Sequence, residues 1–291
     1  IGHGHRSYLD QVHVPGGSFH IMDINDTPKL QSRVGRPIVI FLACHTGAFD
    51  NETDCLAEQM LRTPGGPIAV LAGSRVTMPY AMAVMGDGMI HRYFHENDAT
   101  LGEVILGAKQ KMLLKQLPAT QSLNRQLLDA LAATFSPNKD FLAQELREHV
   151  YLFNLIGDPL LRVRRPQPIV IQAIAQQTAG RVCRVRLQSP IAGTALVEIA
   201  CRPDRLKSRP RARNVFEFTP DAFDEMQRTY LAANDPVWAA AETRVTKGPN
   251  VVELPVPTAA NGPCVIRVYV RNDQFDALGS TSVFITADGR R

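Results

Sequence analysis

The stretch that decides the fold is Pro37-Ile38-Val39-Ile40-Phe41-Leu42-Ala43-Cys44-His45-Thr46-Gly47-Ala48-Phe49-Asp50. Its apolar run from Ile38 to Cys44 has no alternation, which is typical of a strand buried on both faces of a parallel sheet. Such a strand delivers its last residue to the edge of the sheet where ligands bind in open α/β folds. The stretch therefore predicts an α/β domain with Cys44 at that edge.

The flanking sequence extends this prediction over residues 1–165. A short helix that Asp54 can cap precedes a second buried strand at residues 67–72, and helical patterns follow near 101–112, 123–131 and 141–149. We expect a mostly parallel sheet flanked by helices.

The sequence pattern changes after Arg164-Arg165-Pro166. From there on, short β-type runs are separated by turns that contain Gly, Pro and Asn. Their spacing predicts an all-β sandwich of immunoglobulin-like type over residues 166–291, with a helix-prone insertion near 220–243. The runs are residues 169–174, 182–187, 195–200, 250–256, 265–270 and 282–286.

The composition argues against a membrane-spanning protein and against a nucleic-acid-binding protein. The chain has 291 residues, 45% of them hydrophobic, so it can build packed cores, and no apolar run reaches the ~18–20 residues of a membrane span. The net charge of +4 comes from a basic run at Cys201–Arg213, which is best read as a solvated loop. We therefore expect no nucleic-acid partner.

The chemistry-bearing residues fall in two places, Gly2-His3-Gly4-His5 and the strand end at Cys44. A thiolate is a nucleophile, and a nearby imidazole can act as its acid–base partner. A glycine after the histidine allows its N–H to approach an oxyanion closely. The five cysteines are odd in number and contain no CxxC, so at least one thiol stays outside any intramolecular disulfide, and Cys44 is the candidate.

The order Gly-His-Gly, apolar block ending Ala-Cys, then Gly-x-Phe-Asp resembles the gingipain-like cysteine peptidases of the caspase/legumain clan. The resemblance continues in four segments and covers most of residues 1–165. They are Cys55-Leu56-Ala57-Glu58, Gly65-Gly66-Pro67-Ile68-Ala69-Val70, Leu101-Gly102-Glu103 with Ala108-Lys109, and Tyr151-Leu152-Phe153-Asn154-Leu155-Ile156-Gly157-Asp158-Pro159.

The resemblance implies a cysteine endopeptidase that needs no cofactor and forms a thioester acyl-enzyme. Cys44 would be the nucleophile and His3 the catalytic imidazole, favoured over His5 because a small polar residue is usual after His-Gly. The N–H groups of Gly4 and Cys44 would form the oxyanion hole. Substrates would be proteins or peptides, and the location secreted or cell-surface.

The family fold also places strands before the histidine motif. Because this sequence starts at that motif, we expect the sheet to be completed either by missing sequence or by a separate N-terminal fragment. Asp50 is a candidate for binding a basic substrate side chain, as is Asp54, which a helix cap explains equally well. Asp87 and Asp158 are better explained as turn residues than as ligands of a structural calcium ion.

Two other functions stay open. His3-x-His5, with His13, His20 and His45 as further donors, can be read as the zinc site of a hydrolase, although no HExxH occurs. The chain can also be a catalytically degenerate peptidase-like module for binding or adhesion. A serine hydrolase is disfavoured because GxSxG is absent; Gly16-Gly17-Ser18-Phe19-His20 comes nearest.

Overall fold

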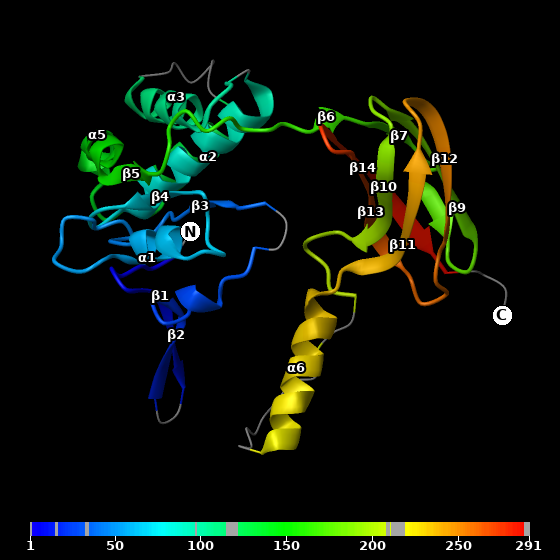
Figure 1. Cartoon of the computed structure of the whole chain (residues 1–291), viewed down its shortest axis with the longest axis horizontal. Helices are drawn as coiled ribbons and strands as arrows, with labels where there is room; N and C mark the ends of the chain where they lie inside the picture. Colours follow the sequence, from blue (N-terminus) through cyan, green and yellow to red (C-terminus); the bar gives the residue numbers. More distant parts are fainter. Residues whose placement is uncertain are drawn as a thin grey trace. The chain divides into compact units, whose positions relative to one another are not determined.

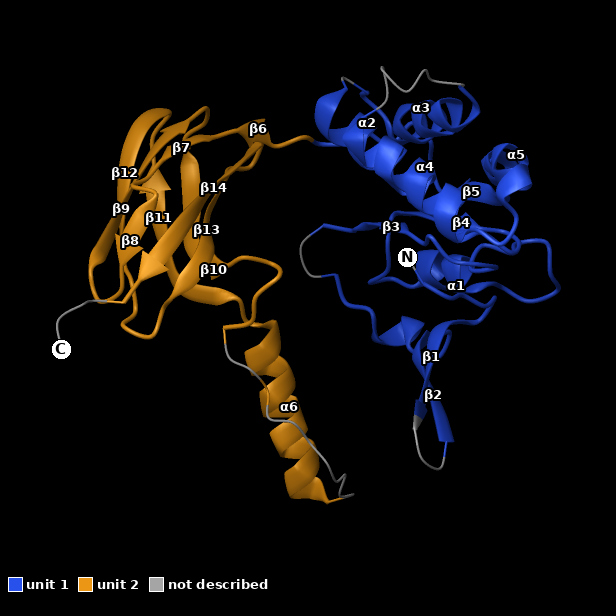
Figure 2. Cartoon of the chain, turned by 180° about the vertical axis from the view of Figure 1, so that it is seen from behind, with its two compact units in different colours: residues 1–164 blue, residues 165–291 orange. Residues whose placement is uncertain are grey.

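The computed structural model describes residues 2–14, 17–32, 35–96, 98–114, 122–207, 210 and 219–287. The chain divides into two compact units, residues 1–164 and residues 165–291 (Figure 2). Unit 1 is mixed α/β, and unit 2 consists of β-sheets and one long helix among the described residues (Figure 1).

Unit 1 is built on the sheet β3-β4-β5. Strand β3 (Ile38–Ile40) pairs in parallel with β4 (Ala69–Gly73), as predicted, but β5 (Phe153–Ile156) runs antiparallel to β4. The described sheet is therefore mixed and not mostly parallel. Strand β5 follows the last residue of α5 (Leu142–Leu152) directly, so the preceding helix sets its direction.

Both faces of this sheet are covered, which explains the apolar runs. Ala69 and Leu71 of β4 face a core formed with helices α2 (Pro79–His95), α3 (Leu101–Leu113) and α5. Val70 and Ala72 face the opposite core with α1 (Leu56–Arg62). Helix α4 (Leu123–Phe135) packs on α2, and a hairpin of β1 (Tyr8–Val14) and β2 (Gly17–Asp23) precedes the sheet.

The prediction of a turn at Asp87 is wrong, because Asp87 lies inside α2. The glycines beside it serve close packing. A Cβ on Gly88 would lie 3.2 Å from the Ala108 Cβ on α3, and one on Gly86 would lie 2.9 Å from Leu42 Cδ1. The spacing between elements, and not a turn, requires small residues here.

Unit 2 contains two sheets around one core. One runs β11-β10-β13-β14-β6, with β8 also paired to β14, and the other runs β12-β9-β7. Each of the six predicted β runs contains or overlaps a strand. The strands are β6 (Gln167–Pro168), β7 (Val170–Gln172), β8 (Gln176–Thr178), β9 (Val182–Ser189), β10 (Gly193–Cys201), β11 (Val237–Val245), β12 (Gly248–Pro255), β13 (Gly262–Arg271) and β14 (Asp276–Thr286).

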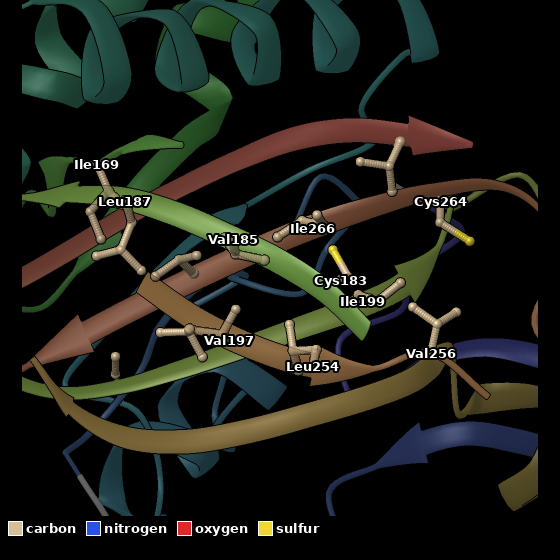
Figure 3. Packing of buried hydrophobic residues seen from close by; sticks show 14 of the residues in the cluster. Ile169, Cys183, Val185, Leu187, Val197, Ile199, Leu254, Val256, Cys264 and Ile266 are labelled. Carbon is tan, nitrogen blue, oxygen red and sulfur yellow. The ribbon is translucent and has the colours of Figure 1, made fainter. Parts of the chain in front are cut away.

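The core of unit 2 follows from residue alternation. Cys183, Val185 and Leu187 of β9 are buried while their neighbours in the strand are exposed. Their side chains meet those of β10 and β13 from the facing sheet (Figure 3). The expected insertion near 220–243 forms helix α6 (Pro220–Asn234) and most of β11.

The described part of the chain contains no helix with both the length and the apolar character that crossing a bilayer requires.

Candidate active site

Cys44 lies just beyond the end of β3. The strand itself covers the first three residues of the predicted run and stops at Ile40. The pairing continues through the Phe41 N–H, which donates to Leu71 O at 2.8 Å. Phe41, Leu42 and Ala43 are buried, and Cys44 is half-buried. The buried run therefore brings the thiol to the carboxyl edge of a parallel strand pair, as predicted from the sequence.

The Cys44 sulfur is held by Thr77, which follows the neighbouring strand β4. The Thr77 backbone N–H donates to Sγ at 3.3 Å, and the Thr77 hydroxyl lies 3.6 Å from the same atom. Sγ in turn lies 3.4 Å from Thr77 O. Thr77 thus places an N–H, a hydroxyl and a carbonyl oxygen against the Cys44 sulfur.

Thr77 is only 3% exposed, and the residues around it fix its position. The next residue, Met78, donates its N–H to His149 Nε2 at 2.7 Å, and His149 Nδ1 lies 2.6 Å from Glu145 O. His149 is therefore held with its proton on Nδ1, which leaves Nε2 as the acceptor for Met78. The loop that carries Thr77 is anchored to α5 in this way.

The Gly2–His5 segment lies against the backbone around Cys44. The Gly2 N–H donates to Leu42 O at 3.2 Å, and a Cβ on Gly4 would lie 2.5 Å from Cys44 O. Only glycine permits this approach at position 4. His3 lies between these two contacts, so the fold brings the backbone of His3 beside that of Cys44, although 41 positions separate them.

The two histidines of the segment differ in their surroundings. His5 stacks on Tyr8 with ring centroids 4.6 Å apart, and its Nδ1 lies 3.2 Å from Ser7 Oγ. Within the described ranges, the exposed His3 imidazole makes no hydrogen bond, ion pair or ring contact. His3 is therefore free to act on a bound molecule.

The turn after Cys44 is tight. His45 adopts a left-handed backbone with φ of +54°, an uncommon conformation for a residue with a Cβ. Its N–H donates to Arg75 O at 3.1 Å, and its carbonyl accepts from the Ala48 N–H at 3.1 Å. These bonds hold the chain in a sharp reversal directly after Cys44.

A comparison with protein families decides the class. The model of peptidase family C25 matches residues 1–164, which is more than half of the chain. The chain belongs to peptidase family C25. This membership supports a cysteine peptidase, the class of hydrolase that the sequence predicted. No curated protein matches the chain in sequence.

Solved structures match at low similarity. One described as "Structure of Protease" is 12% identical, with a TM-score of 0.38, and the match covers 97% of this chain and 53% of that one. The C25 chain thus spans about half the length of that protease. An E. coli alpha-2-macroglobulin matches at 14% identity and a TM-score of 0.31, over 46% of this chain and 11% of that one. A human F-spondin reeler domain matches at 16% identity and a TM-score of 0.25, over 43% and 94%.

The acidic residues that follow Cys44 in the sequence are already paired. Both carboxylate oxygens of Asp50 accept from Arg75, at 3.0 and 2.5 Å, and this bonding holds the pKa of Asp50 below its usual range. Asp54 pairs with Arg62 at 2.7 Å, while Cys55, and not Asp54, is the N-cap of α1. A role for Asp50 in substrate binding stays a prediction.

The proposed calcium and zinc donors are dispersed. Asp87 accepts from Asn124 Nδ2 at 3.2 Å, and Asp158 Oδ1 accepts from the Leu160 N–H at 2.8 Å, as in a turn. His13 bonds Ser18, and His20 stacks on Tyr8. Across the described ranges, no three His, Cys, Asp or Glu side chains gather in a way that could hold a metal ion.

The basic run after Cys201 is only partly described, because Arg209, Arg211 and Arg213 lie outside the described residues. Arg202 forms two hydrogen bonds with Asp204, at 2.5 and 2.6 Å. Lys207 pairs with Asp235 at 2.6 Å and lies 5.5 Å from the centre of the Trp238 ring. These described cations are already neutralised within the C25 chain.

Thr77 and His149 were missed by sequence reasoning. The only local signal at Thr77 is its place before Met78-Pro79, which marks a helix start and carries no chemistry. His149 is a single histidine on a helical face. Their relation to Cys44 arises from tertiary contacts 33 and 71 residues apart in sequence.

Proposed function

We propose that the chain is a cysteine endopeptidase with Cys44 as nucleophile and His3 as the acid–base imidazole. The Cys44 thiolate attacks the carbonyl of the cleaved bond, His3 protonates the leaving amine, and water then hydrolyses the thioester. The free His3 ring and the donors from Thr77 to the Cys44 sulfur support this assignment.

The observation that carries the proposal is the packing of Gly4 on the Cys44 carbonyl. Among the described residues, neither the Gly4 N–H nor the Cys44 N–H donates a hydrogen bond within the chain. Two unused N–H groups beside a thiol are the arrangement that an oxyanion hole needs. We therefore assign the oxyanion to these two donors.

The deciding experiment labels the folded chain with peptidyl acyloxymethyl ketones carrying Arg, Lys, Asn or Asp next to the warhead. We expect an adduct on Cys44, located by peptide mass spectrometry, that is lost in Cys44→Ala and His3→Ala. His5→Ala is the matched control, because His5 lies two residues from His3 and is held in a ring stack. The reactive member of the panel identifies the preferred residue.

A folded chain that takes up no label and cleaves no peptide would support the degenerate binding module instead. Circular dichroism of each variant separates a loss of chemistry from a loss of fold. Labelling that is equally strong in His3→Ala and wild type would contradict the role assigned to His3.

We further propose that the fold is of the caspase-like type and that unit 2 is an immunoglobulin-like sandwich. The parallel β3–β4 pair with helices on both faces supports the first assignment, and two facing sheets around one core support the second. A crystal structure of the chain would test both assignments through its strand order.

We also propose that β3 accepts an extended polypeptide segment on its second edge, a separate N-terminal fragment being the candidate. Among the described residues, β3 pairs with β4 alone. An apolar groove of about 490 Å³ lies beside it, and Ile40, Ile90 and Phe94 in its lining are all exposed. Amide exchange at Ile38 and Ile40, whose N–H groups point away from β4, should be fast in this chain and slow once the fragment is added. Unchanged exchange at these two residues would contradict the proposal.

A further inference from the structure

Two cysteines of unit 2 lie directly opposite each other on neighbouring strands. Cys201 is the last residue of β10, Cys264 is near the start of β13, and the antiparallel register pairs them. Both are buried, at 7% and 1% exposure. They are aligned with the core-facing pair Ile199 and Ile266, so both side chains belong to the inner face of the same sheet.

The hydrogen-bond pattern places this pair at its closest possible spacing. The Arg202 N–H donates to Pro263 O at 3.2 Å, so the next pair along the ladder is the hydrogen-bonded one. The Cys201 N–H points the other way and donates to Pro236 O at 2.8 Å. Cys201 and Cys264 therefore form a non-hydrogen-bonded pair, in which Cα atoms lie about 4.5 Å apart and the side chains approach each other.

That spacing lies within the range of about 4.4–6.8 Å that disulfides span. Burial, together with the neighbouring Cys201 thiol, raises the pKa of Cys264 to about 11. No other cysteine has such a partner: the register places Cys183 opposite Leu254, while Cys44 and Cys55 belong to unit 1.

We propose that Cys201 and Cys264 form a disulfide that ties β10 to β13 where the chain leaves this sheet toward α6. Both cysteines are reduced in the structure. The bond would leave Cys44, Cys55 and Cys183 as free thiols, so the nucleophile assigned above is unaffected. The inference does not depend on the peptidase activity.

The chemistry is two thiol–disulfide exchanges with a small disulfide oxidant such as oxidised glutathione. One cysteine thiolate attacks a sulfur of the oxidant and expels one glutathione thiolate, giving a mixed disulfide. The second cysteine thiolate attacks the protein sulfur of that mixed disulfide and expels the other glutathione. Two cysteine thiols and one oxidised glutathione thus yield one protein disulfide and two reduced glutathiones.

Folding is the stage at which the bond forms most readily. In the finished sheet the thiols are buried, and the high pKa of Cys264 leaves little thiolate to react. While the strands are pairing, both sulfurs are accessible to the oxidant. An oxidising compartment would supply such conditions, in agreement with the secreted or cell-surface location that the family resemblance implies.

The test is to refold the full chain in a buffer of oxidised and reduced glutathione, then alkylate the remaining thiols in denaturant. Intact mass should show three alkylated cysteines, against five after prior reduction. Digestion with trypsin, which does not cleave between Arg202 and Pro203, should yield residues 187–205 linked to residues 248–267. Five free thiols, or a link between any other pair, would overturn the proposal.

Matched variants report on the same bond. Cys183→Ala, in the same core, should keep the link, whereas Cys201→Ala and Cys264→Ala should each lose it and show four free thiols. The melting temperature of the oxidised wild type should exceed that of its reduced form by about 5 °C or more, because the cross-link restricts the unfolded chain. An equal effect of reductant on the double variant Cys201→Ala/Cys264→Ala would contradict this assignment.

Fluorescence of the single tryptophan reports on the disulfide without alkylation or digestion of the chain. Trp238 packs against the core cluster of unit 2 that contains Cys264. Because a disulfide quenches indole emission on contact, oxidised wild type should fluoresce less than reduced wild type. Equal emission from the two forms would contradict a bond at this position.

Discussion

The Cys44 sulfur accepts a hydrogen bond from the Thr77 backbone N–H, with 3.3 Å between nitrogen and sulfur. This contact joins the segments that follow β3 and β4, so it exists only when the two strands are paired. The Thr77 hydroxyl lies 3.6 Å from the same sulfur. Formation of the sheet therefore supplies the polar environment of the proposed nucleophile.

Replacement of Thr77 by valine should reduce reactivity without unfolding the chain. The change preserves the side-chain shape and the backbone donor but removes the hydroxyl that lies near Cys44 Sγ and Met82 Sδ. We expect kcat/KM for peptide cleavage to fall by about 2–10-fold, which corresponds to the loss of one ordinary hydrogen bond. Thr77→Ser should stay within twofold of wild type, and a Val variant with full activity would show that the hydroxyl has no role.

Addition of one methyl group at Gly4 should impair both stability and activity. A Cβ there would lie 2.5 Å from Cys44 O, so the segment carrying His3 must move away. We expect Gly4→Ala to lower the free energy of unfolding by about 1–3 kcal/mol in urea titrations and to reduce labelling of Cys44 more than tenfold. Gly2→Ala is the control, because its nearest atom, Asp10 Oδ2, is 3.6 Å away.

Replacement of His149 by phenylalanine should act on the site from a distance. Phenylalanine fills the same buried space but cannot accept the Met78 N–H, which then lacks its partner. The expected cost is about 2 kcal/mol of unfolding free energy in urea titrations, together with slower alkylation of Cys44 because Thr77 is adjacent to Met78. Slower alkylation of Cys44 without a loss of stability would contradict this prediction, and so would a loss of stability without slower alkylation.

Stability at alkaline pH should depend on Tyr80. Burial, followed by a hydrogen bond to Asp129, raises the pKa of Tyr80 to about 12. The unfolded value is about 10, so the contribution of this phenol is fully present below pH 10 and is lost as the pH rises through 12.

We therefore expect Tyr80→Phe to be less stable than wild type by about 1 kcal/mol at pH 8. Urea titrations at several pH values should show the difference shrinking above pH 10, as the wild type loses the proton that the variant never had. A difference that stays constant between pH 8 and pH 12 would show that Tyr80 ionises normally.

Sequence patterns predict the elements of unit 2 better than those of unit 1. In β9 the buried and exposed residues alternate without a break, so both the strand and its inner face can be read directly. In unit 1, Gly86-Asp87-Gly88 has the composition of a turn, yet the packing of α2 on Leu42 and Ala108 makes it helical. Local composition cannot distinguish a glycine needed for a turn from one needed for close contact.

The residues of the candidate site also differ in how far the sequence predicts them. Cys44 could be located because it is the last residue of a buried apolar run, and Gly4 because it belongs to the Gly-His-Gly motif before that run. Thr77 and His149 could not, since only the packing of three separate segments brings them to the thiol. The pairing of Asp50 with Arg75 could not be predicted either, because it also arises from tertiary packing.

The attachment of α6 to unit 2 bears on how proteins of this architecture can diverge. Residues 202–236 leave the sheet after Cys201 and return to pair with the same strand, closed by the hydrogen bond between Cys201 N–H and Pro236 O. These residues form a long hairpin connection, and the register of β10 and β11 shifts only next to it, between Ile199 and Ala200. Insertions, deletions or exchange of whole segments can accumulate here while the strand order stays intact.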